Sequence, residues 1–209
     1  MSRDRGSMYR WRQMTSDQRA EVLADRIAHD LPVHSLAHFE NNSTSYYLIT
    51  AACYEHKHII GRSPARIQAF ERELVQLLDD ECHQVFAWTV LPNHYHALVD
   101  APSILDVLQS LGKLHGRNSF FWNGEEGARG RKVWCNAAET AMKSQGHYYA
   151  SMNYVLHNAV HHGYVDKWTD WPYCSATEYL ERIGREKALQ IWNRYPIYDF
   201  GKDWDPADL

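Results

Sequence analysis

Residues 84–101, QVFAWTVLPNHYHALVDA, constrain the fold of this chain more than any other stretch. Two runs rich in β-branched, aromatic and aliphatic residues flank Pro92 and Asn93, two residue types that are typical of a tight turn. The pattern predicts a β-hairpin in which His94 begins the returning strand. Patterns with helical spacing lie on both sides of this hairpin, so it stands at the centre of the predicted order of elements.

Two helices with serine caps are predicted to flank the hairpin. The first spans residues 63–78, where Ser63 and Pro64 precede a stripe of apolar side chains, and the second begins after Ser103. The other predicted elements are strands at residues 46–54 and 132–136 and helices at residues 145–163 and within 171–184. The order β-α-β-β-α-β, followed by helices, predicts an α+β fold of the ferredoxin-like, split βαβ type, with an antiparallel sheet and helices on one face.

The domain organisation follows from the same patterns. Residues 1–45 are predicted to form an N-terminal extension with a short helix at 15–29, and residues 46–183 the main domain. Residues 184–209 are predicted to form a C-terminal tail that packs on this domain. Because the chain has neither a run of about 20 apolar residues nor the apolar stretch of a signal peptide, we expect a cytoplasmic protein.

Charge and cysteine content exclude some classes of function. The four cysteines lie far apart without a C-x-x-C pair, which argues against a zinc ribbon or a thioredoxin-type site and favours reduced thiols. The net charge of -4 argues against nonspecific binding to nucleic acid. Basic residues nevertheless gather in residues 1–12 and 113–143, so local basic surfaces are compatible with an acidic chain.

His94 and His96 are candidate metal ligands. Residues two apart in a strand point to the same face, so both imidazoles can face one site. Imidazole binds several divalent cations when a third group converges on the same point. With thirteen histidines in 209 residues, however, the spacing is also expected by chance. The alternative is two half-buried histidines that are hydrogen-bonded to their neighbours.

The predicted helix of residues 145–163 carries a second candidate pair. Its apolar arc is predicted to bury against the sheet, while Tyr154 and Asn158 lie on a different face, four residues apart and therefore one above the other. A phenol and a carboxamide could then face a shared site. The alternative is an exposed tyrosine without a role. Tyr149 and Asn153 have the same spacing but lie next to the apolar arc, and they form the weaker pair.

Several ordered blocks together resemble one known family. LPNHYHALVD is similar to the metal-binding strand of the HUH single-tyrosine transposases, and NYVLHNAVHHGYV is similar to their catalytic helix. With YRWRQMT, YYLITAACYEHKHIIG and WPYCSATEYL, the chain resembles the REP-associated tyrosine transposases from about Tyr9 to about Leu180.

The resemblance implies a metal-dependent endonuclease and strand transferase that acts on single-stranded DNA hairpins. His94, His96 and Asn158 would bind Mg²⁺ or Mn²⁺, and Tyr154, on a C-terminal helix, would be the nucleophile. Its phenolate would attack a phosphodiester, leaving a 5′-phosphotyrosine and a free 3′-hydroxyl, and a later attack by a 3′-hydroxyl would reseal the strand. No nucleotide cofactor is needed, because the covalent intermediate conserves the energy of the phosphodiester bond.

The DNA contacts implied by the resemblance come from basic and aromatic residues. The basic candidates are Arg10, Arg12, Lys113, Arg117, Arg129, Arg131 and Lys132, with Trp11 and Trp134 as stacking surfaces. Residues 1–45 would then include a DNA-binding arm of a protein associated with the nucleoid. A monomer is favoured, although relatives include dimers. The alternative interpretation is that the basic residues form a solvated charged face and that the tryptophans belong to the core.

The chain departs from the family pattern at three places. His-His-Gly at residues 161–163 replaces the common Lys-His-Gly. Ala159 stands where a proline usually follows the asparagine, which should extend the helix without removing a ligand. CNAAETAMKS lacks the aromatic-acidic pair often found there in relatives. Two alternatives therefore remain beside the enzyme: a protein that binds structured single-stranded DNA without cutting it, and an unrelated α+β domain with a structural metal site.

Overall fold

The computed structural model describes residues 15, 17, 24 and 44–197. The chain divides into two compact units, residues 1–38 and 39–209, and the helices and strands between residues 44 and 197 belong to the second. Arg10, Trp11 and Arg12 lie outside the described residues, as does most of the predicted helix at 15–29. Across the described part of the chain, no helix is long and apolar enough to cross a membrane.

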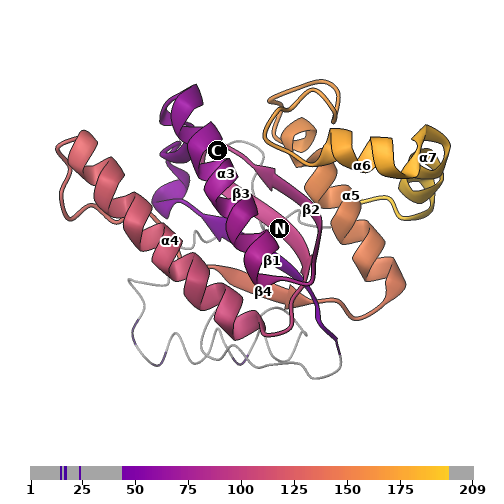
Figure 1. Cartoon of the computed structure of the whole chain (residues 1–209), viewed down its shortest axis with the longest axis horizontal. Coiled ribbons are helices and arrows are strands. Elements are labelled where there is room, and N and C mark those ends of the chain that lie inside the picture. Colours follow the sequence, from indigo (N-terminus) through magenta and orange to yellow (C-terminus); the bar gives the residue numbers. More distant parts are fainter. Residues whose placement is uncertain (1–14, 16, 18–23, 25–43, 198–209) are drawn as a thin grey trace. The chain divides into compact units, whose positions relative to one another are not determined.

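A four-stranded antiparallel sheet forms the centre of the second unit (Figure 1). Its strands are β1 (Tyr46–Ala52), β2 (Gln84–Val90), β3 (His94–Asp100) and β4 (Ala138–Ala141), in the spatial order β2-β3-β1-β4. The predicted hairpin is confirmed, because β2 and β3 pair antiparallel on either side of the Pro92–Asn93 turn. The strands β3 and β1 are central, and six of the seven β3 residues are buried.

One face of the sheet is covered by the two helices that the sequence predicts. These are α3 (Pro64–Glu81) and α4 (Ile104–Glu125), which lie side by side (Figure 1). The hydroxyl of Ser63 accepts a hydrogen bond from the Arg66 N–H, so the predicted cap is present. The apolar stripe of α3 is buried against the side chains of this face of the sheet.

The other face of the sheet is covered by α5 (Gln145–His161), and here the prediction of helices on one face was wrong. Leu48 and Leu98, which point away from α3 and α4, share a core with Met152 and Val155 of α5. The physical reason is that the central strands carry apolar residues on both faces, so each face must be covered.

A C-terminal helical pair completes this second layer. The helices are α6 (Ala176–Ile183) and α7 (Arg185–Arg194). The imidazole of His157 on α5 stacks between Trp168 and Trp192, with ring centroids 4.9 and 3.8 Å away. The α5 helix therefore lies between the sheet and the C-terminal segment that carries these two indoles.

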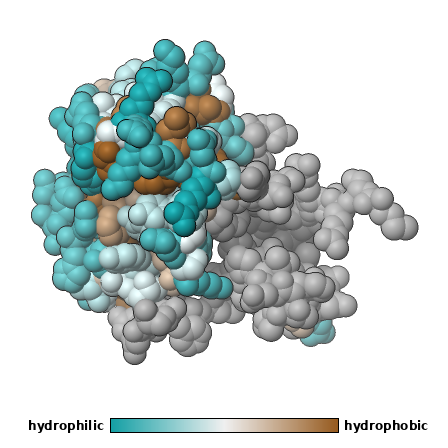
Figure 2. Space-filling model, turned by 90° about the vertical axis from the view of Figure 1, so that its right-hand side faces the viewer, coloured by the Kyte–Doolittle hydropathy of each residue, from teal (hydrophilic) through white to brown (hydrophobic). Residues whose placement is uncertain are grey.

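The outer surface on this side is largely hydrophilic. Viewed from the side on which α6 and α7 lie in Figure 1, the described surface has only a limited apolar area (Figure 2).

The weaker tyrosine and asparagine pair of α5 has a structural place in the contact with the C-terminal segment. Asn153 Nδ2 donates to the carbonyl oxygen of Tyr195 at 2.7 Å, and the Tyr149 ring stacks on the Tyr195 ring with centroids 4.9 Å apart. Both contacts join α5 to the segment that follows α7. This pair therefore faces away from the sheet.

The fourth strand lies at residues 138–141, not at the predicted 132–136. The predicted segment forms only an isolated β-bridge, between Cys53 and Trp134. Trp134 is 7% exposed and stacks on His115 with ring centroids 4.1 Å apart, so it belongs to the core and is not a surface for DNA bases. Burying the indole takes this segment out of the regular pairing of the sheet.

Burial of His115 predicts a pH-dependent stability. Burial lowers the pKa of this imidazole to about 4, and its Nε2 lies 3.1 Å from the Tyr95 hydroxyl. Between pH 6.5 and 4 the unfolded chain binds a proton that the folded chain does not. The free energy of unfolding therefore decreases as the pH is lowered, by about 3 kcal/mol at most. Urea unfolding from pH 7 to 4.5 measures this loss. His115→Gln should show a smaller pH slope, and an equal slope would contradict the prediction.

Candidate active site

The histidines of β3 form the floor of the candidate site. The β1 partners of His94 and His96 are Ala52 and Thr50, and Thr89 of β2 pairs with His96 on the other side. Both histidine side chains are buried and point to the face covered by α5, while Tyr95 between them points into the opposite core. The strand alternation predicted from the sequence is confirmed.

The α5 helix brings the predicted phenol and carboxamide onto this floor. Asn158 Oδ1 lies 3.0 Å from His94 Nε2, and the Tyr154 hydroxyl lies 3.4 Å from His96 Nε2. The two imidazole centroids are 5.1 Å apart. Four residues that are separated by up to 64 positions in the sequence therefore share one site. Tyr154 and Asn158 are both buried against the sheet.

The outer nitrogen of each imidazole is held by a neighbour. His96 Nδ1 lies 2.8 Å from the Thr50 hydroxyl, and His94 Nδ1 lies 2.7 Å from Asn93 Oδ1. Both Nε2 atoms therefore point towards α5. In metal sites, a partner at one imidazole nitrogen orients the other nitrogen towards the ion.

The donor atoms fit a divalent cation. An imidazole with its proton on Nδ1 has a lone pair at Nε2, and Asn158 Oδ1 opposite it is also an acceptor. Asn158 Nδ2 is buried and has no hydrogen-bond partner among the described residues, so no bond at Nδ2 fixes which amide atom faces the imidazole. A cation would satisfy both acceptors, whereas without one the amide must rotate so that Nδ2 donates to Nε2.

The ligand set would contain no charged group. Within the described residues, no group of three or more His, Cys, Asp or Glu side chains is placed to hold a metal ion. A cation at this site would therefore take two imidazoles and the amide of Asn158, with its other positions open. Two nitrogen ligands suit Mn²⁺ better than Mg²⁺, which prefers oxygen.

The site is closed to solvent. The side chain of Tyr154 is 1% exposed, and His96 is fully buried. His162, which caps the end of α5, packs edge-on against His94 with ring centroids 4.9 Å apart. Sequence reasoning missed His162, Thr50 and Asn93 as neighbours of the site. Their roles depend on contacts across the fold, and only the place of Asn93 beside His94 could have been a signal.

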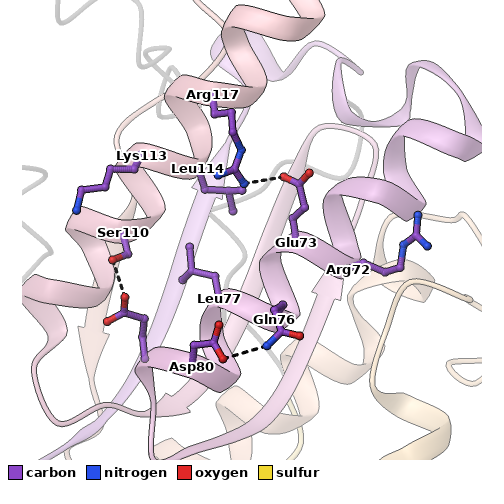
Figure 3. Close-up of a pocket in the computed structure, with 10 residues that line it drawn as sticks. Arg72, Glu73, Gln76, Leu77, Asp80, Ser110, Lys113, Leu114 and Arg117 are labelled. Carbon is purple, nitrogen blue, oxygen red and sulfur yellow. Dashed lines mark hydrogen bonds and ion pairs between the residues drawn. The ribbon is translucent and has the colours of Figure 1, made fainter.

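Two of the predicted DNA contacts lie far from this site, on the outside of the opposite layer. Lys113 and Arg117 of α4 line a shallow pocket of about 510 Å³ between α3 and α4 (Figure 3). Arg117 forms an ion pair with Glu73 at 3.1 Å. Because α3 and α4 cover the face of the sheet opposite α5, these residues and Tyr154 are not brought together.

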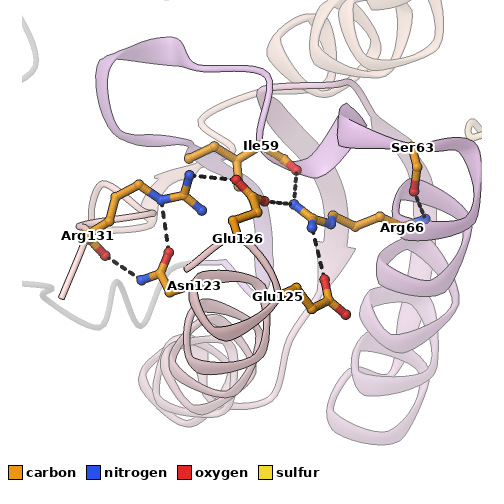
Figure 4. Close-up of polar contacts among 7 residues, drawn as sticks. All are labelled: Ile59, Ser63, Arg66, Asn123, Glu125, Glu126 and Arg131. Carbon is orange, nitrogen blue, oxygen red and sulfur yellow. Dashed lines mark hydrogen bonds and ion pairs between the residues drawn. The ribbon is translucent and has the colours of Figure 1, made fainter. Parts of the chain in front are cut away.

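Arg131 belongs to a structural ion-pair network (Figure 4). Its guanidinium donates to Glu126 and to Asn123 Oδ1, each at 2.9 Å, and Arg66 of α3 also donates to Glu126. Hydrogen bonds from Arg131 and Arg66 lower the pKa of Glu126 to about 2. The predicted role of Arg131 in DNA binding therefore competes with a role in joining α3, α4 and the following loop.

Arg129 and Lys132 lie on the surface of the same loop. The Arg129 guanidinium donates to the carbonyl oxygen of Phe120 at 2.6 Å and lies over the Phe120 ring at 4.2 Å. Lys132 is exposed, with its ammonium 5.0 Å from the centre of the Tyr54 ring. Tyr54 follows the end of β1 that pairs with His94, so Lys132 lies at the same end of the sheet as the candidate site.

Comparison with known proteins supports the fold. No family model and no curated protein matches the chain. A solved structure of a REP-associated tyrosine transposase bound to a REP hairpin is similar, with a TM-score of 0.55 and 18% sequence identity. The likeness covers 71% of this chain and 86% of that chain. The α+β architecture of this chain, with the four-stranded antiparallel sheet predicted from the order of elements, is consistent with this likeness of fold.

The ion-pair network predicts unequal roles for two adjacent basic residues. Arg131→Ala removes one of the two arginine partners of Glu126 and the donor to Asn123 Oδ1, so the free energy of unfolding should fall by about 1 to 3 kcal/mol. Lys132→Ala removes an exposed side chain and should change it by less than about 0.5 kcal/mol. Urea unfolding at pH 7 measures both. Equal effects would show that the network does not stabilise the fold.

Proposed function

We propose that this protein is a metal-dependent single-stranded DNA endonuclease and strand transferase, similar to a transposase, that acts through a 5′-phosphotyrosine intermediate. The observation that carries the proposal is that the Tyr154 hydroxyl lies 3.4 Å from His96 Nε2, beside the pair formed by His94 and Asn158. A phenol, two oriented imidazoles and a buried amide are the groups that such a reaction requires. The solved neighbour of similar fold is bound to a REP hairpin, which supports a DNA hairpin as the substrate class.

The reaction is a transesterification. The Tyr154 oxygen loses its proton and forms a bond to phosphorus, while the bond from phosphorus to the 3′ oxygen breaks and this oxygen takes up a proton. The reverse attack by a 3′-hydroxyl rejoins a strand and releases the tyrosine. A bound Mn²⁺ or Mg²⁺ would neutralise charge on the scissile phosphate. His94, His96 and Asn158 would hold the cation, and α5 holds the phenol next to His96.

The DNA strand is proposed to approach from the end of the sheet where His94 begins. Lys132 lies at that end and Arg129 is exposed on the same loop, so both are proposed phosphate contacts. Arg10 and Arg12, outside the described residues, remain proposed contacts of a DNA-binding arm. Lys113 and Arg117 would contact only DNA that extends around the opposite layer. We expect a monomer that works in the cytoplasm on the nucleoid.

A covalent adduct tests the proposed nucleophile. Incubation with a labelled single-stranded hairpin and Mn²⁺ should give a protein–DNA species that survives denaturation. Tyr154→Phe removes the attacking oxygen and should abolish this species, a loss of at least about 1,000-fold. Tyr149→Phe is the matched control on the same helix, because its ring faces the C-terminal segment. An adduct that persists in Tyr154→Phe would refute the assignment.

Cation binding gives a second test that does not need a substrate. A ligand that binds only the folded state stabilises it by about 2.7 kcal/mol when the ligand concentration is 100 times the dissociation constant. Mn²⁺ should therefore raise the melting temperature. His96→Gln should remove this rise. His83→Gln, at an exposed position, is the control and should keep it. A rise of equal size in His96→Gln would place the cation elsewhere.

A second candidate function is binding of structured single-stranded DNA without cleavage. The observation that favours it is the burial of the Tyr154 side chain, which is 1% exposed, so a phosphodiester can reach the phenol only after a conformational change. Retention of the hairpin in a mobility shift, with no adduct across varied hairpins and cations, would favour this function. An adduct with any of them would favour the nuclease.

A further inference from the structure

A strained turn lies at the end of the sheet beside the candidate site. Glu55 and His56, in the 3₁₀ turn η1 (Tyr54–His56), have φ of 58° and 47°, and they are the only non-glycine residues with positive φ in the described part of the chain. Such a conformation is unfavourable for residues with a Cβ atom and persists only where surrounding contacts hold it. The turn begins two residues after Ala52, the partner of His94.

Asn93 links this turn to the hairpin by two hydrogen bonds. Its Nδ2 donates to the His56 carbonyl oxygen at 3.2 Å, and its own carbonyl oxygen accepts from the Cys53 N–H at 2.6 Å. The neighbouring Pro92 carbonyl oxygen accepts from the Gly61 N–H at 2.9 Å, where a Cβ atom on Gly61 would lie 2.4 Å from the Pro92 side chain. Asn93 is buried, so its amide is fixed in direction.

The direction of this amide determines the tautomer of His94. A backbone carbonyl can only accept, so the atom of Asn93 facing His56 must be the Nδ2 donor. The opposite atom is then Oδ1, which can only accept, and it lies 2.7 Å from His94 Nδ1. His94 Nδ1 must therefore carry the proton. In a neutral imidazole this leaves a lone pair on Nε2, the atom that faces Asn158.

We propose that Asn93 is a positioning residue that couples the left-handed Glu55–His56 turn to the tautomer of His94. The two bonds of one amide, to His56 and to His94, make the turn and the metal ligand a single unit. Without Asn93 the imidazole exchanges between two neutral tautomers, and in one of them Nε2 carries a proton and binds no cation. The part of this inference that concerns the cation rests on the proposed function, whereas the tautomer does not.

Nitrogen-15 NMR of the metal-free protein tests the tautomer directly. In the unsubstituted protein His94 should show a protonated Nδ1 and an unprotonated Nε2. In Asn93→Ala the His94 signals should shift towards a protonated Nε2, while the His115 signals, from the opposite face of the sheet, should not move and report that the core is intact. A His94 that keeps Nδ1–H in Asn93→Ala would overturn the proposal.

Cation affinity gives the second readout. Mn²⁺ titration calorimetry should show affinity about 10- to 100-fold weaker in Asn93→Ala, the range typical for loss of an outer partner of a metal ligand. Asn136→Ala, at an exposed asparagine, is the matched control and should leave affinity unchanged. A changed tautomer with unchanged affinity would overturn the link to the cation. If Mn²⁺ fails to bind the unsubstituted protein, the proposed function fails, and the tautomer comparison still decides the role of Asn93.

Asn93→Asp keeps the test decisive if Asn93→Ala does not fold. A carboxylate still accepts from His94 Nδ1 but cannot donate to the His56 carbonyl oxygen. His94 should therefore keep its Nδ1 proton, Mn²⁺ should bind at least as tightly as before, and the amide protons of residues 54–57 should exchange faster. Loss of the Nδ1 proton in this variant would show that the turn, and not the acceptor atom, sets the tautomer, which contradicts the proposal.

Discussion

The burial of two imidazoles on the central strand β3 is the constraint on which the rest of the structure depends. A polar group removed from water costs free energy unless it keeps a hydrogen bond. Thr50 and Asn93 supply partners for the two Nδ1 atoms, and the two Nε2 atoms are met by Tyr154 and Asn158. The position of α5 over the sheet is therefore tied to these polar contacts as well as to its apolar side chains.

The outer side of α5 is fixed by a different type of contact. The stack of His157 between Trp168 and Trp192, and the hydrogen bond from Asn153 to the Tyr195 carbonyl oxygen, hold the helix from the side opposite the sheet. Burial also lowers the pKa of His157 to about 4, so this ring is neutral near pH 7 and can lie between two indoles without carrying a charge into them. The helix that carries the phenol is thus held by its own chain on both sides.

The sequence predicted the features that depend on residues close together in the chain. The hairpin at 84–101 and the serine caps follow from turn and cap chemistry, and strand alternation alone placed both imidazoles on one face. The features that the sequence did not show have a different cause. Trp134 was assigned by residue type to a stacking surface, but it lies in a core that includes His115. The DNA contact of Arg131 stays a prediction, and its link to α3 through Glu126 depends on a helix distant in sequence. Asparagine is a residue type that is typical of turns, so the place of Asn93 could be predicted. The direction of its side-chain amide depends on contacts with His56 and His94 in the folded chain.

The same chemistry that makes the site suitable for a cation also explains why it is closed. Two imidazoles and an amide carry no negative charge, so they would leave the full charge of the proposed divalent ion available to a phosphate, but they provide no carboxylate to hold that ion in water. A buried site compensates, because electrostatic interactions are stronger where water is excluded. The 3.4 Å separation between the Tyr154 hydroxyl and His96 Nε2 is long for a hydrogen bond to a hydroxyl group. Under the proposed function, the buried phenol has to turn towards the phosphodiester, while His96 and His94 keep the contacts of their Nδ1 atoms with Thr50 and Asn93.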